Sequence, residues 1–184
     1  MDMDIEFRIL NYIQEHFRSG GMDVVMSIIS MMGKLSAMWI VIAIVCMIIK
    51  KTRQFGFTLT LDLIANFVFG NLIIKPIVSR IRPCVLNRTV QVINSIPFDP
   101  SFPSGHTMFA FGAATIIFIY NKWLGLLAYL FAFVMGFSRM YMYMHFPTDV
   151  LIGGILGIIF AVIVYNLQRS FKKAYGGKRF APGY

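Results

Sequence analysis

Charged side chains are scarce in this 184-residue chain: they make up 14% of it, while hydrophobic residues make up 58%. A typical soluble domain has about 25% charged residues and about 45–50% apolar residues. A soluble globule of this length could not bury so much apolar surface. The composition therefore argues against a soluble enzyme, a disordered tail or a nucleic-acid-binding module, and we expect no nucleic-acid partner.

Cysteines and acidic residues are also few. Two cysteines, Cys46 in an apolar run and Cys84 in a loop, do not make a disulfide framework. The eight Asp and Glu residues form no acidic cluster of the kind that holds Mg²⁺, so we expect neither a metal nor another cofactor. The first residues lack the pattern of a secretory signal peptide. The length allows one domain and hardly two.

Long stretches with little charge predict membrane-spanning helices, which need about 20 apolar residues each. Five such stretches occur, over residues 22–49 with a possible break at Gly33, then 54–74, 100–121, 123–138 and 150–168. In the last one, Gly153 and Gly157 have the spacing of a close helix contact. We expect an all-α fold, an integral-membrane bundle of about five transmembrane helices.

The N-terminal segment differs from these spans because it mixes charges with a regular apolar pattern. Its apolar residues recur every four positions, at Ile5, Ile9, Ile13 and Phe17. This pattern predicts an amphipathic helix, which would lie either on the bilayer surface or as a cap on the bundle. We expect an amphipathic segment over 1–21, a transmembrane domain over 22–170 and a basic tail over 171–184.

Basic residues predict the orientation of the bundle. With five spans, nine cations and no acid fall on one side: Lys50, Lys51, Arg53, Lys122, Arg169, Lys172, Lys173, Lys178 and Arg179. The positive-inside rule assigns that side to the cytoplasm. We therefore expect a multi-pass protein of the cell membrane with a cytoplasmic C-terminus.

Three polar clusters lie at the opposite, extracytoplasmic ends of the predicted spans. Ionisable residues at such places are costly and are functional candidates by default. The five-span topology brings all three to the same side, although they were not used to choose it. The clusters are Lys75-x6-Arg82-Pro83, Pro103-Ser104-Gly105-His106 and Ser138-Arg139-x5-His145-x3-Asp149.

The residue types in these clusters suit the binding of a phosphate group. Lys75, Arg82 and Arg139 supply three positive charges, and the planar fork of arginine matches phosphate oxygens. Ser104 and Gly105 open a helix, whose first backbone N–H groups can face an anion. Such a cradle needs no metal.

Two histidines supply candidate reactive groups. His145 and Asp149 are one helical turn apart, so the carboxylate can accept a hydrogen bond from one ring nitrogen and leave the other free to attack. His106 comes from a different helix and could protonate the leaving oxygen. Each cluster alone also fits a structural or anchoring role, but the three together favour a site.

In this order and spacing, the clusters resemble the tripartite signature of the type 2 phosphatidic acid phosphatase superfamily at every signature position. The resemblance implies a helical bundle and metal-independent hydrolysis of a phosphate ester or diphosphate. It also implies a phosphohistidine on His145 assisted by Asp149, with His106 as acid and then base. By the same resemblance, the phosphoryl group binds to Lys75, Arg82, Ser104, Gly105 and Arg139.

The short chain is similar to the small bacterial membrane phosphatases of this superfamily. This similarity implies a lipid phosphate or diphosphate as substrate, such as phosphatidic acid, phosphatidylglycerophosphate or undecaprenyl diphosphate. Two alternatives stay open: a phosphotransferase that uses the same site with an acceptor other than water, and a non-catalytic lipid-binding or transport protein. The sequence selects neither the lipid nor the oligomeric state.

Overall fold

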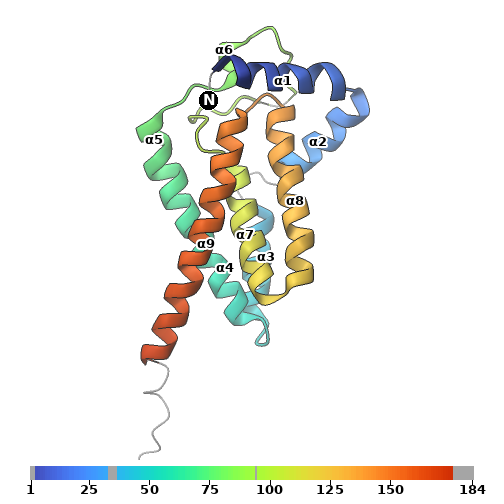
Figure 1. Ribbon diagram of the computed structural model, residues 1–184. Helices are drawn as coiled ribbons and strands as arrows, with labels where there is room; N and C mark the ends of the chain where they lie inside the picture. The colour runs from blue at the N-terminus through green and yellow to red at the C-terminus, as the bar shows by residue number, and fades with distance from the viewer. Residues whose placement is uncertain (1–2, 33–36, 94, 176–184) are drawn as a thin grey trace, which may run out of the picture.

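The computed structural model describes residues 3–32, 37–93 and 95–175, and all regular structure within them is helical. This confirms the predicted all-α fold. Figure 1 shows the long helices side by side in a bundle, with the N-terminal helix lying across one end. The main helices are α1 (Met3–Phe17), α2 (Gly20–Met32), α3 (Ala37–Ile48), α4 (Arg53–Asn66), α7 (Gly105–Tyr120), α8 (Lys122–Tyr141) and α9 (Pro147–Tyr175).

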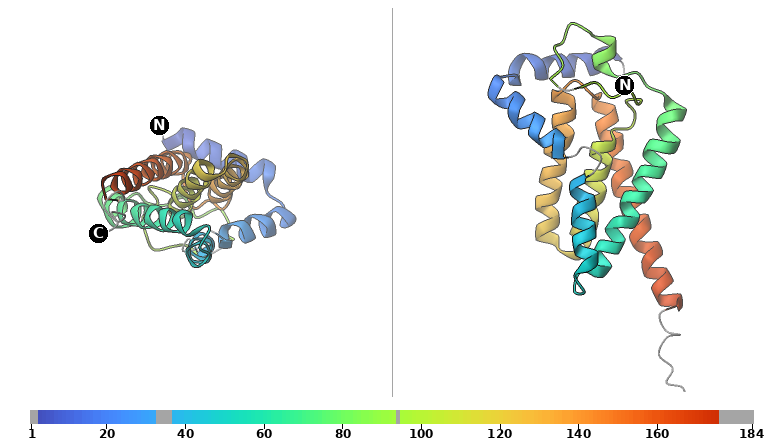
Figure 2. Two further views of the ribbon diagram at one scale, coloured as in Figure 1. Left: turned by 90° about the horizontal axis from the view of Figure 1, so that it is seen from below. Right: turned by 180° about the vertical axis from the view of Figure 1, so that it is seen from behind.

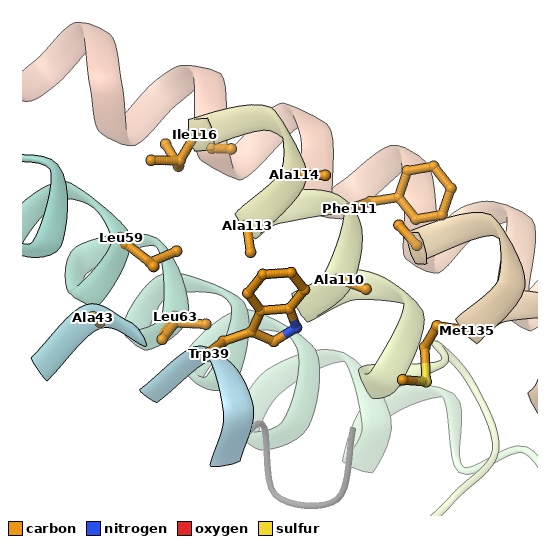
Figure 3. Packing of buried hydrophobic residues seen from close by; sticks show 12 residues of the cluster. Trp39, Ala43, Leu59, Leu63, Ala110, Phe111, Ala113, Ala114, Ile116 and Met135 are labelled. Atoms are coloured by element: carbon orange, nitrogen blue, oxygen red, sulfur yellow. The ribbon is translucent and has the colours of Figure 1, made fainter. Parts of the chain in front are cut away.

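The centre of the bundle is α7, which packs against α4, α8 and α9. Its small residues, among them Ala110, Ala113 and Ala114, are completely buried and let the neighbouring helices approach closely. Figure 3 shows that Trp39 of α3 and Leu63 of α4 pack in the same cluster as these alanines. Figure 2 shows α3 beside α4 in the view from behind.

The predicted close contact at the two glycines of α9 is confirmed. A Cβ atom at Gly157 would lie 2.3 Å from the carbonyl oxygen of Met108, and one at Gly153 would lie 2.8 Å from that of Ser104. Only glycine permits such an approach, because no side chain then separates the two backbones. The start of α9 is thereby held directly against the start of α7.

The long helical stretches only partly follow the predicted spans. The second begins at α4 and continues through a wider π-helical stretch, η2 (Phe67–Ile74), into α5 (Lys75–Val78). Three stretches of the described chain are long and apolar enough to cross a membrane: Arg53–Leu86, Lys122–Tyr141 and Pro147–Ala174. α2 and α3 would together make a fourth, and the break predicted at Gly33 lies outside the described residues. The number of five spans stays a prediction.

The predicted span over 100–121 is wrong in its first part. The helix begins only at Gly105 and is 16 residues long. Pro100 and Pro103 lack the backbone N–H that a helix interior needs, so residues 100–104, directly before Gly105, are not helical. As a result, residues 100–104 form a loop at the end of the bundle instead of the first turn of a span.

The helix α1 packs on the bundle through a stripe that shares only Ile13 with the apolar repeat of the sequence. Its buried residues are Glu6, Leu10 and Ile13, whereas Ile5 and Ile9 remain exposed. Leu10 and Ile13 join a second hydrophobic cluster with residues of the α8–α9 connection. The helix therefore caps the bundle with one stripe and leaves an apolar stripe uncovered, so its position at a membrane surface stays a prediction.

The two ends of the bundle differ in chemistry. The α3–α4 and α7–α8 connections and the far end of α9 lie at the end away from α1 (Figure 1). The described basic residues of the predicted cytoplasmic side belong to these segments, and Lys178 and Arg179 lie outside the described residues. α9 itself runs past the predicted boundary at residue 170. The three polar clusters lie at the end with α1, together with α6 (Pro83–Leu86).

Candidate active site

Two of the predicted phosphate-binding cations hold a carboxylate between them. Lys75 at the start of α5 donates a hydrogen bond through Nζ to Asp99 Oδ2. Arg82 donates through Nη2 to Asp99 Oδ1 at 2.9 Å and through Nε to the Asp99 backbone oxygen at 2.9 Å. Both cations are buried, while the Asp99 side chain is 47% exposed. The sequence did not predict this role for Asp99.

The electrostatics of this pair favour an anion strongly. Burial opposes ionisation of Asp99, but the hydrogen bonds and positive charges of Lys75 and Arg82 outweigh it and lower the pKa of Asp99 to about 2. The side chain is therefore ionised at neutral pH. The place between the two cations accepts an anionic oxygen group, which is what a phosphoryl group would present.

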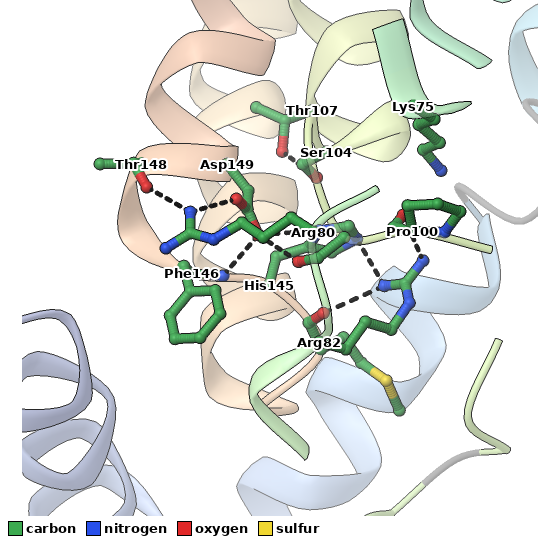
Figure 4. Close-up of polar contacts among 12 residues, drawn as sticks. Lys75, Arg80, Arg82, Pro100, Ser104, Thr107, His145, Phe146, Thr148 and Asp149 are labelled. Carbon is green, nitrogen blue, oxygen red and sulfur yellow. Dashed lines mark hydrogen bonds and ion pairs between the residues drawn. The ribbon is translucent and has the colours of Figure 1, made fainter. Parts of the chain in front are cut away.

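His145 contacts the same Arg82 guanidinium with one ring nitrogen. Its Nε2 lies 3.1 Å from Nη1 of Arg82, and Figure 4 shows the two side chains turned toward each other. A guanidinium can only donate, so Nε2 must accept and the ring proton must be on Nδ1. Burial lowers the pKa of His145 to about 3, Arg82 and Arg139 act in the same direction, and Asp149 only partly offsets them. The imidazole is therefore neutral near pH 7.

Asp149 lies next to the other ring nitrogen, as the four-residue spacing predicted, but the predicted hydrogen bond is not made. Asp149 Oδ2 is 3.6 Å from His145 Nδ1, which is too long for a hydrogen bond. The oxygen instead accepts a hydrogen bond from Ser101 Oγ and one from the Phe146 backbone N–H at 2.9 Å. Asp149 is thus held in place beside the ring.

Arg80 is a functional candidate that the sequence analysis did not select. Its Nη1 donates to Asp149 Oδ1 at 2.7 Å and to Thr148 Oγ1 at 2.7 Å (Figure 4). The available signal was its position two residues before Arg82, inside the first cluster. Ser101 carried no comparable signal, because the segment that contains it was predicted to be helical.

The second cluster joins the site through the start of α7. Ser104 uses its backbone N–H to bond the Asp149 backbone oxygen at 3.0 Å, and its Oγ contacts Thr107 Oγ1 at 2.9 Å. Ser104 is thereby engaged with protein groups. A Cβ at Gly105 would lie 4.0 Å from Lys75 Nζ, so the first N–H groups of α7 are next to that cation. His106 is the second residue of α7 and lies within electrostatic range of the positive charges of Arg139, Lys75 and Arg82.

Arg139 completes the arrangement from α8. It is 4% exposed, and its Nη1 donates to Ser30 Oγ of α2. Within the described part of the chain, its Nε has no hydrogen-bond partner. The eight predicted residues therefore lie together at one end of the bundle. Among the described residues, no three His, Cys, Asp or Glu side chains are grouped so as to hold a metal ion.

Comparison with known proteins gives a consistent family match. Residues 51–173 match the model of the PAP2 superfamily. An undecaprenyl-diphosphatase of Sulfolobus acidocaldarius is 30% identical over 152 residues, which cover 82% of this chain and 71% of that protein.

Two solved structures resemble the whole bundle. The crystal structure of Aquifex aeolicus LpxE has a TM-score of 0.76 and 27% identity, and the match covers 87% of this chain and 94% of that one. A transmembrane PAP2-type phosphatidylglycerolphosphate phosphatase from Bacillus subtilis has a TM-score of 0.76 at 24% identity, and the match covers 97% of this chain and 89% of that one. The second likeness shows a shared fold.

Proposed function

The chain belongs to the PAP2 superfamily, and on this premise we propose that it is a membrane phosphatase that hydrolyses a lipid phosphate or diphosphate. The observation that carries the proposal is the anion held between Lys75 and Arg82, because the same Arg82 guanidinium also contacts Nε2 of His145 through its other terminal nitrogen. A phosphoryl group in the place of the Asp99 carboxylate would meet two cations, and Arg82 would link it to the neutral imidazole of His145. These are the requirements for nucleophilic attack on phosphorus.

The reaction proceeds in two steps that share one histidine nucleophile. The Nε2 lone pair of His145, once released from the hydrogen bond that it accepts from Arg82, forms a bond to phosphorus, and the bond from phosphorus to the lipid oxygen breaks. His106 donates a proton to that oxygen, and the lipid leaves as an alcohol or as a lipid monophosphate. His106 then takes a proton from water, the water oxygen attacks phosphorus, and the phosphorus–nitrogen bond breaks to release inorganic phosphate.

The other site residues stabilise charge during these steps. Asp149 faces Nδ1 of His145 and favours the positive charge that the ring gains when Nε2 is phosphorylated. The Nε of Arg139 and the first N–H groups of α7 offer donors for the phosphoryl oxygens. Asp99 and Asp149 are both occupied by cationic side chains, which supports a mechanism without a metal.

A lipid substrate suits the surroundings of the site. The apolar helices and the family membership make the chain a multi-pass membrane protein. A groove of about 800 Å³ between α8 and α9 is lined by apolar residues that include Phe137, Leu151 and Ile155, and it reaches Thr148 beside Asp149. It offers room for a hydrocarbon chain. We propose that the site faces the extracytoplasmic side, because the basic connections lie at the opposite end.

The test is phosphate release by the purified protein in detergent micelles. The panel is phosphatidic acid, phosphatidylglycerophosphate, undecaprenyl diphosphate and undecaprenyl monophosphate, each with and without EDTA. We expect release from at least one lipid, unchanged by EDTA, and none from His145→Ala that elutes as wild type on size exclusion. A folded wild-type protein that releases phosphate from none of them would contradict the function. A loss in EDTA that Mg²⁺ restores would contradict the metal-independent mechanism.

A further inference from the structure

A buried glutamate from the N-terminal helix contacts the supporting side of the site. Glu6 in α1 is 1% exposed, although it lies on a helix at the end of the bundle. Its Oε1 accepts hydrogen bonds from the backbone N–H of Thr148 at 3.2 Å and from Thr148 Oγ1. Its Oε2 accepts one from Nη2 of Arg80. Glu6 lies outside the residues that match the family model.

Arg80 connects this glutamate to Asp149. One guanidinium nitrogen bonds Glu6 and the other bonds Asp149 Oδ1 at 2.7 Å. The guanidinium also lies over the ring of Phe146, 4.0 Å from its centroid, which fixes its plane. Arg80 therefore stands between two carboxylates in a single orientation.

The combined charge of Glu6, Arg80 and Asp149 determines how strongly Asp149 can stabilise a positive charge on His145. Two carboxylates and one guanidinium leave one net negative charge. Without Glu6, Arg80 would pair with Asp149 alone, and this pair would carry no net charge to stabilise a phosphorylated, positively charged imidazole. The groups that face this cluster are Glu6 from α1, Arg80 and Arg82 from the segment after α5, Arg139 from α8, and His145 with Asp149 at the start of α9.

We propose that Glu6 is a positioning residue for the phosphatase reaction: it holds Arg80 and the first turn of α9, so that Asp149 keeps both its place and its negative charge beside His145. The inference rests on the proposed function. It assigns a role in the reaction to the N-terminal helix, which lies outside the three signature clusters.

Further contacts from the two N-terminal helices reach the same turn of the chain. Tyr143, two residues before His145, donates through its hydroxyl to Asn11 Oδ1 at 2.7 Å. Gln14 donates to the backbone oxygen of Tyr141 at 2.6 Å, and the hydroxyl of Tyr141 donates to Asp23 Oδ1 at 2.6 Å. The end of α8 and the connection between α8 and α9 are thus held by hydrogen bonds from both α1 and α2.

The test compares a change of charge with a change of length at Glu6. In Glu6→Gln the amide oxygen can still accept from Thr148, but its NH2 group cannot accept from Arg80. In Glu6→Asp the charge stays and the reach shortens. We expect Glu6→Gln to lower kcat for phosphatidic acid, or for whichever panel lipid the wild type hydrolyses, by about 10- to 100-fold, the range seen for outer partners of metal-bound histidines. KM should stay at the wild-type value, and Glu6→Asp should retain more activity than Glu6→Gln.

Glu15→Gln is the matched control, since it removes the same charge from an exposed position of the same helix. It should have wild-type kcat and KM. The defect of Glu6→Gln should persist with p-nitrophenyl phosphate, because an activated leaving group does not repair the nucleophile. Wild-type kcat in Glu6→Gln, or a Gln variant at least as active as the Asp variant, would overturn the inference.

Arg80 gives a second route to the same answer if Glu6→Gln does not fold, as judged by size exclusion in detergent. Arg80→Gln should lower kcat with little change in KM, whereas the exposed Arg88→Gln should behave as wild type. Wild-type kcat in a folded Arg80→Gln would then overturn the inference. A wild-type protein that is inactive on every panel lipid would refute the proposed function itself. The ratio of variant kcat to wild-type kcat tests only the inference about Glu6.

Discussion

Asp149 and Asp99 are carboxylates of the same site and each pairs with an arginine, but their surroundings differ. Asp149 is fully buried and is held by Arg80, Ser101 and the Phe146 backbone N–H. Asp99 has a side chain that is 47% exposed, and it lies in the connection between α6 and α7. We refer to Asp149, Arg80 and His145 as the nucleophile side, and to Asp99, Lys75 and Arg82 as the phosphate side.

The difference indicates two different uses of a carboxylate. On the nucleophile side the contacts come from several elements and are directed at fixing one orientation, as an orienting group requires. On the phosphate side the carboxylate occupies the cations that a substrate phosphoryl group needs. In the proposed function a substrate must therefore displace Asp99, whereas Asp149 must stay. Substitutions at the two positions should accordingly act on different kinetic constants.

The largest effect is expected on the nucleophile side, from Asp149→Asn. This change removes the charge that stabilises the phosphorylated ring, and its NH2 group would oppose the Phe146 N–H. By analogy with the orienting aspartate of hydrolase triads, kcat should fall by about 10³–10⁴-fold. Steady-state kinetics of the folded variant on the best panel lipid measure it. A change confined to KM would show that Asp149 acts in substrate binding, and it would contradict the distinct roles of Asp149 and Asp99.

His106 should show a smaller and conditional effect. General acid catalysis contributes about 10²–10⁴-fold, so His106→Ala should lose activity in this range on a lipid monophosphate. The loss should shrink with p-nitrophenyl phosphate, whose leaving group departs without a proton, whereas the losses of His145→Ala and Asp149→Asn should not. Equal losses of His106→Ala on both substrates would contradict the assignment of His106 as the proton donor.

The phosphate side should respond in the opposite direction. Asp99→Asn removes the internal anion from Lys75 and Arg82, so inorganic phosphate should inhibit the variant more strongly than the wild type. A half-exposed ion pair contributes up to about 1 kcal/mol, which corresponds to an inhibition constant lower by about fivefold. Competitive inhibition assays measure it, with Glu15→Gln as the control. Weaker inhibition in Asp99→Asn would mean that Asp99 assists phosphate binding.

The predicted site residues could be found from the sequence because their chemistry is local. The four-residue spacing of His145 and Asp149 predicted that they lie close together, although His145 is in the connection before α9 and not on a shared helical turn, and the alternation of spans brings the three clusters to one end. Their precise contacts could not be found in this way. Arg82 meets His145 across 63 positions of the chain, and Ser101 reaches Asp149 only because the segment before Gly105 is a loop.

Glu6 shows why the orientation of a helix about its own axis escapes the sequence. The repeat of Ile5, Ile9, Ile13 and Phe17 predicted an amphipathic helix, but it did not specify which face packs on the bundle, and it assigned no role to Glu6. Arg80 and Thr148 instead turn the face with Glu6 and Leu10 toward the bundle. A buried carboxylate is stable there because its partners are charged or hydrogen-bonded. Nothing in residues 1–19 alone encodes those partners.

The smallest effect is expected from a change of pH. The difference in phosphate inhibition between wild type and Asp99→Asn should not depend on pH near neutrality. Lys75 and Arg82 lower the pKa of Asp99 to about 2, below the value of about 3.9 for an unperturbed aspartate. A carboxylate with a lowered pKa contributes its pairing energy fully above the unperturbed pKa and loses it only as the pH falls through the lowered one.

The ratio of the phosphate inhibition constants of wild type and Asp99→Asn should therefore stay flat between about pH 5 and about pH 8. Measuring both proteins at each pH cancels the titration of phosphate itself and of groups common to both. A ratio that falls toward one as the pH drops to about 5 would mean that burial, and not the two cations, controls the charge of Asp99. The carboxylate would then protonate and leave the cations free, and Asp99 would act as a pH-dependent competitor and not as the constant one that its contacts with Lys75 and Arg82 predict.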